Sequence, residues 1–81
     1  MITIKFEIEN NRAVALDGSK IAGECSFSVS GNVWNIVYTG VDSAYQGQGI
    51  ARRLVECVIA NANKEHVTLE ADCSYAKKVI G

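Results

Sequence analysis

The sequence contains no proline, a single histidine and a formal net charge of only −1 at pH 7. Without a large excess of one charge, the chain has no general attraction for nucleic acid or for an anionic membrane. The histidine, His66, has no second imidazole with which to hold a metal ion and no obvious partner for a Ser-His-Asp mechanism. These scarcities disfavour a nucleic-acid-binding protein, a metal site and a serine hydrolase. We expect His66 to lie at the end of a helix, where a partial positive charge is favourable.

The cysteines are few and unpaired in the sequence. Cys25, Cys57 and Cys73 are an odd number, and no two of them are close together. A disulfide framework or a Cys-x-x-Cys zinc or redox site would need cysteines in pairs. We therefore expect neither, and we expect Cys57, on the apolar side of a predicted helix, to be a small core residue.

Long hydrophobic runs are missing as well. No apolar stretch approaches the roughly 20 residues of a membrane span. At the start of the chain, Thr3, Lys5 and Glu7 interrupt the hydrophobic residues, which is unlike the continuous apolar core of a secretion signal. These features predict a cytoplasmic protein. With 81 residues, of which 48% are hydrophobic, the chain has room for one small compact domain that spans residues 1–81.

The first half of the chain has the alternating pattern of β-strands. Apolar and polar residues alternate over residues 2–8, with Phe6 and Ile8 on the apolar side, and again over residues 21–29, where Cys25, Phe27 and Val29 are apolar. Asp17-Gly18 is a favoured tight turn between strands. Residues 33–41 are apolar on both faces, which is typical of a strand covered on both sides. We predict an antiparallel meander.

One long helix is predicted over residues 49–63. Its apolar residues recur at helical spacing around Leu54, whereas Arg53 falls on the opposite face. A short strand over residues 67–71 follows. Because a strand, helix, strand unit of this length is a right-handed crossover, the last strand should lie parallel to residues 33–41. A short C-terminal helix is expected from about Ser74. The predicted fold class is α/β, with a mixed sheet.

Two glycines mark the start of the long helix. Gly47 and Gly49 let the backbone turn sharply from strand to helix, and they leave space for a ligand near the main chain. The first helical N–H groups lack partners and carry the positive end of the helix dipole, so an anion fits there. A plain structural turn can carry the same glycines. The third glycine of a dinucleotide fingerprint and the Gly-Lys-Ser/Thr of a P-loop are both missing.

The spacing Gln-x-x-Gly-x-Ala over Gln46, Gly49 and Ala51 resembles the acetyl-CoA signature of the GNAT superfamily of N-acetyltransferases. Together with Asp72-Cys73-Ser74-Tyr75, it is similar to a small single-domain group of that superfamily, the YjdJ-type predicted acetyltransferases, over residues 21–79. The resemblance implies a minimal GNAT-like domain that binds acetyl-CoA and transfers its acetyl group to an amine. The acceptor would be a small molecule, a protein lysine or a protein N-terminus.

The resemblance also implies the site residues. Loop amides would hold the CoA pyrophosphate, and the residues expected to bind the cosubstrate are Val41, Gln46, Gly47, Gln48, Gly49, Ile50, Ala51 and Arg52. Tyr75 is a candidate proton donor to the leaving thiolate, or else a packed aromatic. Cys73 is a candidate nucleophile toward the thioester, with a non-covalent role in lining the site or a structural role as alternatives. Nearby Asp72 would oppose formation of a thiolate.

Two other classes of function stay open at this point. The superfamily's enzymes have further N-terminal helices and C-terminal strands around the acceptor, for which 81 residues leave no room. A CoA-binding module without chemistry would fit that difference. A small interaction domain, in which the glycines form only a turn, would bind no CoA at all.

Overall fold

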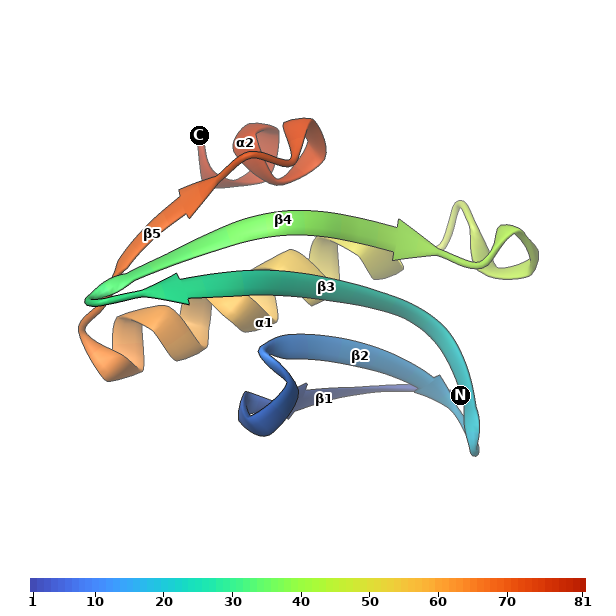
Figure 1. Cartoon of the computed structure of the whole chain (residues 1–81). Helices are drawn as coiled ribbons and strands as arrows, with labels where there is room; N and C mark the ends of the chain where they lie inside the picture. The colour runs from blue at the N-terminus through green and yellow to red at the C-terminus, as the bar shows by residue number, and fades with distance from the viewer.

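A single sheet carries one long helix across one face, and a short helix follows the last strand (Figure 1). The computed structural model describes all residues, 1–81. The strands are β1 (Ile2–Glu7), β2 (Arg12–Asp17), β3 (Lys20–Ser30), β4 (Val33–Val41) and β5 (Thr68–Ala71). The helices are α1 (Ile50–Glu65) and α2 (Ser74–Ile80), with short 3-10 turns η1 (Ile8–Asn10) and η2 (Ser43–Tyr45).

The order of the strands in the sheet is their order in the chain, β1-β2-β3-β4-β5. β1 to β4 pair antiparallel, and β5 pairs parallel to β4 after the crossover through α1. The predicted meander, the parallel last strand and the short C-terminal helix are therefore confirmed. Neither helix combines the length and the hydropathy that a membrane span requires.

His66 ends α1 as expected. It adopts a left-handed conformation with φ of 58°, and its backbone N–H reaches the carbonyls of Ala62 and Asn63. A residue in this conformation satisfies carbonyls that the end of a helix leaves without partners. The chain then turns back toward the sheet, and the N–H of Val67 donates to the carbonyl of Ala62 at 3.1 Å.

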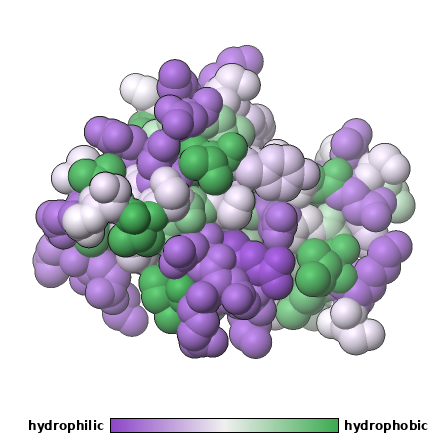
Figure 2. Space-filling model, viewed as in Figure 1, coloured by the Kyte–Doolittle hydropathy of each residue, from purple (hydrophilic) through white to green (hydrophobic).

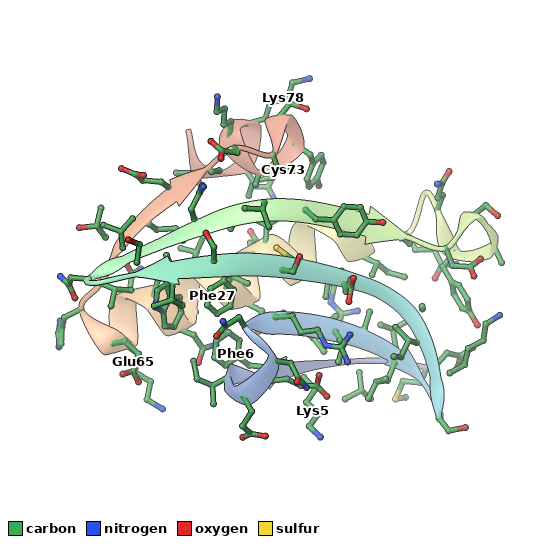
Figure 3. The ribbon with its side chains drawn as sticks, viewed as in Figure 1. Lys5, Phe6, Phe27, Glu65, Cys73 and Lys78 are labelled. Carbon is green, nitrogen blue, oxygen red and sulfur yellow. The ribbon has the colours of Figure 1, made fainter.

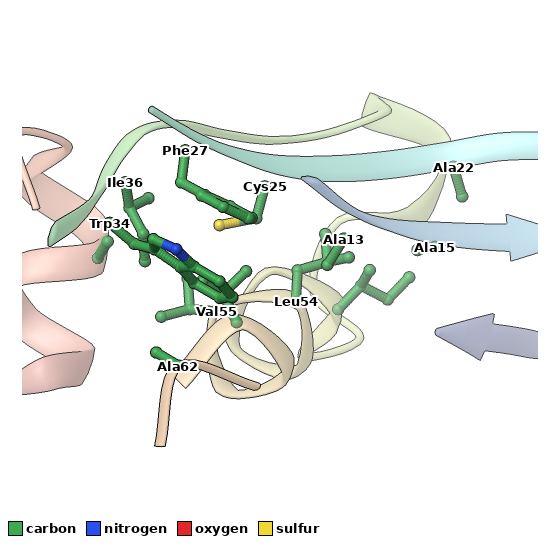
Figure 4. Packing of buried hydrophobic residues seen from close by; sticks show 13 residues of the cluster. Ala13, Ala15, Ala22, Cys25, Phe27, Trp34, Ile36, Leu54, Val55 and Ala62 are labelled. Carbon is green, nitrogen blue, oxygen red and sulfur yellow. The ribbon is translucent and has the colours of Figure 1, made fainter. Parts of the chain in front are cut away.

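The core lies between the sheet and α1 (Figure 4). On the helix side, the buried residues are Ile50, Leu54, Val55, Val58 and Ala62. On the sheet side, the rings of Phe27 and Trp34 stack with centroids 4.5 Å apart, and Phe6 stacks 5.9 Å from each. The predicted apolar face of the helix is thus confirmed. Cys57 is only half-buried at the edge of this cluster.

A β-bulge in β4 changes which residues face the helix. Phe27 pairs with Ile36, but the preceding Ser26 pairs with Tyr38, so Val37 is an extra residue on β4. Side chains therefore switch faces at this point. Val37 and Tyr38 are 47% and 53% exposed. The prediction of a strand covered on both sides is wrong, because no element covers the outer face of the sheet.

Two further apolar positions lie outside the core, contrary to the alternating pattern. Ile8 is 47% exposed because the chain leaves β1 at Glu7 and enters the turn η1. Val29 is 48% exposed near the tip of the hairpin between β3 and β4. The uncovered face of the sheet is mostly hydrophilic, with separate hydrophobic residues (Figure 2). On it, Arg12 bridges Glu7 and Glu24 at 2.7 and 2.8 Å.

Candidate functional site

The site begins where β4 and β5 stop pairing. The last paired residues are Ile36 and Ala71. The carbonyl of Ile36 then accepts two hydrogen bonds, from the N–H groups of Asp72 at 2.9 Å and Cys73 at 3.2 Å. β4 continues to Val41, whereas the chain after β5 turns away into α2. The second half of β4 therefore has no partner on its β5 side, and the sheet is open there.

A cleft of about 390 Å³ lies at this opening. β4, the loop after it, the first turn of α1 and α2 all contribute side chains. Its lining residues are Thr39, Gly40, Val41, Tyr45, Gln46, Gly47, Ile50, Ala51 and Tyr75. The carboxyl end of a parallel strand pair is the usual ligand crevice of an open α/β sheet. The cleft is thus where the topology places a ligand.

The loop at one end of the cleft presents a run of backbone donors. Gly47 and Gly49 have φ of 83° and 74°, and a Cβ added to either would meet no atom within 4 Å. The first N–H of α1 with a backbone acceptor is that of Arg53, which donates to Gly49 at 3.2 Å. The six preceding N–H groups, of residues 47–52, have no protein acceptor. Such a run of amides at a helix N-terminus favours an anion.

The residues predicted to bind the cosubstrate are brought together in part. Val41, Gln46, Gly47, Ile50 and Ala51 line the cleft. The remaining three, Gln48, Gly49 and Arg52, do not, although their amides belong to the same loop.

The side chain of Arg52 points to solvent. Its Nε lies 3.2 Å from the Glu56 carboxylate, and both side chains are more than half exposed. An exposed pair four residues apart on a helix contributes little to stability. Arg52 is therefore free to exchange this partner for a ligand phosphate, and its backbone N–H already belongs to the run of unpaired amides.

Cys73 lies where the chain passes from β5 into α2 (Figure 3). Its thiol donates to the hydroxyl of Thr39, with Sγ and Oγ1 3.6 Å apart. Burial raises the pKa of this thiol, but the nearby N–H group of Ala76, the Thr39 hydroxyl and the N–H groups of Tyr75 and Thr39 favour the thiolate and together outweigh burial, so the pKa is lowered. Cys73 does not itself line the cleft; it touches Thr39, which does.

The pKa values of the other two thiols, those of Cys25 and Cys57, are raised rather than lowered. Burial raises the pKa of Cys25 to about 11 and also raises that of Cys57. The carboxylate expected to oppose ionisation of Cys73, Asp72, accepts a hydrogen bond from Asn35 at 2.9 Å. We therefore expect the three cysteines to differ in reactivity, because the thiolate is the reactive form.

We predict that iodoacetamide at pH 7.5 modifies Cys73 before Cys25 and Cys57. A lowered pKa means more thiolate at a given pH, and Cys25 is fully buried as well. Peptide mapping over a time course measures the order. Earlier modification of Cys25 or Cys57 would contradict this description of the thiols.

Tyr75 lines the cleft and is 38% exposed, so it is not simply a packed aromatic. Three further lining residues, Thr39, Gly40 and Tyr45, were not among the site residues predicted from the sequence. The Tyr45 hydroxyl donates to the Asp17 carboxylate at 2.6 Å, which lowers the pKa of Asp17 and ties the loop after β4 to the end of β2. Lys20 lies 5.4 Å above the same ring. In the sequence, the only indication of the contact between Tyr45 and Asp17 is the polar turn at residue 17.

Comparisons with known proteins agree on one family. A family model described as GCN5-related N-acetyl-transferase matches residues 5–81. A GCN5-like protein from Staphylococcus aureus is similar in structure, with 29% identity, a TM-score of 0.72 and coverage of 96% of this chain and 76% of that chain. No curated protein matches the chain.

Two larger structures are similar over part of their length. A GCN5-related N-acetyltransferase from Sphaerobacter thermophilus has 23% identity over 76% of this chain, with a TM-score of 0.71, but this chain spans only 21% of its length. The NatC complex bound to Gag peptide and CoA contains a chain with 25% identity over 85% of this one, a TM-score of 0.63 and 53% coverage of that chain. This chain therefore spans about a fifth of the length of the first of these chains and about half of the second.

Proposed function

The chain belongs to the family of GCN5-related N-acetyltransferases, and we propose that it binds acetyl-CoA and transfers the acetyl group to an amine. The observation that carries this proposal is the run of unpaired amides over residues 47–52 at one end of a cleft between β4 and α2. Within the family, we assign it to the small single-domain, YjdJ-type group, as one acetyl-CoA-binding domain over residues 1–81.

The loop amides and the cleft would hold different parts of acetyl-CoA. The pyrophosphate is the anion that suits six free N–H groups at the start of α1, and Gly47 and Gly49 leave room for it. Arg52, with Lys77 and Lys78 exposed on α2, offers positive charge for the remaining phosphates. The apolar wall of Val41, Ile50 and Ala51 suits the pantetheine arm. CoA in the similar NatC structure supports this choice of cosubstrate.

Backbone donors of β4 are available for the thioester carbonyl. The N–H of Asp42 donates to the Ala22 carbonyl on β3 at 2.7 Å. Because successive N–H groups of a strand point to opposite sides, those of Val41 and Thr39 are directed toward the β5 side, where β4 has no partner. Donors placed at the carbonyl oxygen stabilise the negative charge that develops there during acyl transfer.

We propose a covalent route through Cys73. Its thiolate attacks the thioester carbonyl carbon, a new C–S bond forms, and the bond to the CoA sulfur breaks. The CoA thiolate takes a proton from the Tyr75 hydroxyl, which regains one from solvent. The nitrogen of an uncharged amine then attacks the carbonyl carbon of acetyl-Cys73 and gives a proton to solvent water, a C–N bond forms, and the C–S bond to Cys73 breaks, which regenerates the Cys73 thiolate. The lowered pKa of Cys73 supports its role as nucleophile.

We also propose a cytoplasmic location, which the three free thiols support because disulfides are rare in that compartment. The acceptor is an amine, either of a small molecule or of a protein lysine or N-terminus. These assignments rest on the site and on the family together.

Intact mass spectrometry tests the covalent route. After incubation of the full chain with acetyl-CoA, we expect one added acetyl group on the natural protein and on Cys25→Ala and Cys57→Ala, but none on Cys73→Ala. Persistence of the label in Cys73→Ala would overturn the role of this residue. Absence of any label, although acetyl-CoA binds, would favour direct attack by the amine or a binding module without chemistry.

A further inference from the structure

One hydroxyl lies between two thiols behind the wall of the cleft. Thr39 Oγ1 is 3.6 Å from Cys73 Sγ and 3.5 Å from Cys25 Sγ. In this arrangement Cys73 donates to Thr39, and Thr39 donates to Cys25. Thr39 also lines the cleft, so it is the direct link between the ligand space and the cysteine at the start of α2.

A hydroxyl has one proton, which it can give to only one of these sulfur atoms at a time. Cys25 is fully buried and keeps its own proton at neutral pH. Its neutral sulfur is a weak acceptor. A Cys73 thiolate is a much better one, because hydrogen bonds to charged groups are stronger than those to neutral groups. Loss of the Cys73 proton therefore reverses the preferred direction of the Thr39 hydroxyl.

We propose that Thr39 is a positioning residue for acetyl transfer: its hydroxyl rotates from Cys25 to Cys73 when Cys73 loses its proton, and it holds the thiolate against the wall of the cleft. This role rests on the proposed function, in which Cys73 reacts with the thioester. Rotation about a single bond is the only movement required.

Few charged groups compete with this hydroxyl. β5 and the residue after it contribute Glu70 and Asp72, of which Asp72 is held by Asn35. α2 contributes Tyr75, Lys77 and Lys78. β3 contributes the neutral Cys25, β4 contributes no charge beside Thr39, and the face of α1 toward the sheet is apolar. Removal of the Thr39 hydroxyl should therefore act chiefly on Cys73.

The test is the pH dependence of Cys73 alkylation by iodoacetamide, followed by peptide mapping on the full chain. Thr39→Val keeps the shape and the backbone N–H but lacks the hydroxyl. We expect the midpoint to rise by about one pH unit and the rate at pH 7.5 to fall about tenfold. Thr39→Ser restores a hydroxyl and should restore the natural midpoint. Cys25→Ala removes the competing acceptor, so the midpoint should not rise.

An unchanged midpoint in Thr39→Val, or a midpoint in Thr39→Ser as high as in Thr39→Val, would overturn the proposal. If Thr39→Val does not fold, Thr39→Ala gives the same comparison. Alkylation needs no acetyl-CoA, so this result is independent of the proposed function. If the natural protein never acquires an acetyl group but the midpoints shift as expected, the proposed transfer reaction is wrong, whereas the proposed role of Thr39 toward the Cys73 thiolate is still supported.

Discussion

Acetyl-CoA at one hundred times its dissociation constant is expected to raise the melting temperature of this chain by about 10 °C or more. A ligand at that concentration adds about 2.7 kcal/mol to the free energy of unfolding, provided that it binds only the folded state. In a domain of 81 residues, each kcal/mol corresponds to roughly 4–8 °C. Differential scanning fluorimetry with and without acetyl-CoA measures the rise.

Gly49→Val is expected to abolish this rise. The new side chain would project into the open space beside the unpaired amides, where the pyrophosphate is proposed to lie. The φ of 74° also strains valine, so a second variant is needed. Gly49→Asn tolerates that conformation better and still fills the space, and it should weaken the rise as well.

Gly31 provides the matched control. It lies in the turn between β3 and β4 with φ of 57°, and an added Cβ there also meets no atom within 4 Å. Gly31→Val and Gly31→Asn should lower the stability of the unliganded chain but keep the acetyl-CoA response. An equal response in the Gly49 and Gly31 variants would exclude the loop from binding.

Leu54→Ala is expected to lower the free energy of unfolding by about 2–5 kcal/mol. Leu54 is fully buried against the sheet, and its Cδ1 would lie 3.3 Å from a Cβ on Gly23 of β3. Its truncation leaves a cavity that the surrounding strands and helix cannot fill completely. Urea denaturation measures the loss.

Arg53→Ala is the control on the neighbouring position. Its side chain is exposed and makes no ion pair, so the loss should stay below about 0.5 kcal/mol. Comparable losses from Arg53→Ala and Leu54→Ala would mean that the helix packs with a different face.

Much of the fold follows from local patterns in the sequence. The alternation around Phe6 and Phe27 predicts strands with one buried face, and the 3.6-residue spacing around Leu54 predicts the buried stripe of α1. The handedness of the crossover then predicts the parallel β5. The family model confirms the acetyltransferase domain that the loop and the C-terminal residues suggested.

The bulge at Val37 could not be predicted, because register depends on pairing between distant residues. Residues 33–41 carry apolar side chains on both faces, which predicts a strand that is buried on both sides. In the structure, the extra residue turns Tyr38 outward over Gly40, where an added Cβ would collide with the tyrosine ring. Nothing within β4 itself indicates that residue 37 lacks a partner on β3.

Part of the candidate site could also be predicted from the sequence. Gly47 and Gly49 indicate the loop in the sequence, because glycine adopts a positive φ easily and this preference belongs to the residue itself rather than to its tertiary contacts. The contact of Thr39 with Cys73 was not predictable, since it depends on how β4 and the chain after β5 diverge beyond Ile36. The contact of Tyr45 with Asp17 was not predictable either, since it joins the loop after β4 to the end of β2. Each contact holds a residue that lines the cleft, Thr39 or Tyr45, and both come from tertiary structure alone.

The measurement that tests the central claim most directly is release of CoA thiol from acetyl-CoA in the presence of an amine panel that includes small amines, lysine peptides and free peptide N-termini. We expect amine-dependent release by the natural protein, slower release by Gly49→Asn, and release at the natural rate by Gly31→Asn. No release with any amine, although acetyl-CoA raises the melting temperature, would contradict transfer and leave a CoA-binding module. No response to acetyl-CoA in either measurement would contradict the site itself.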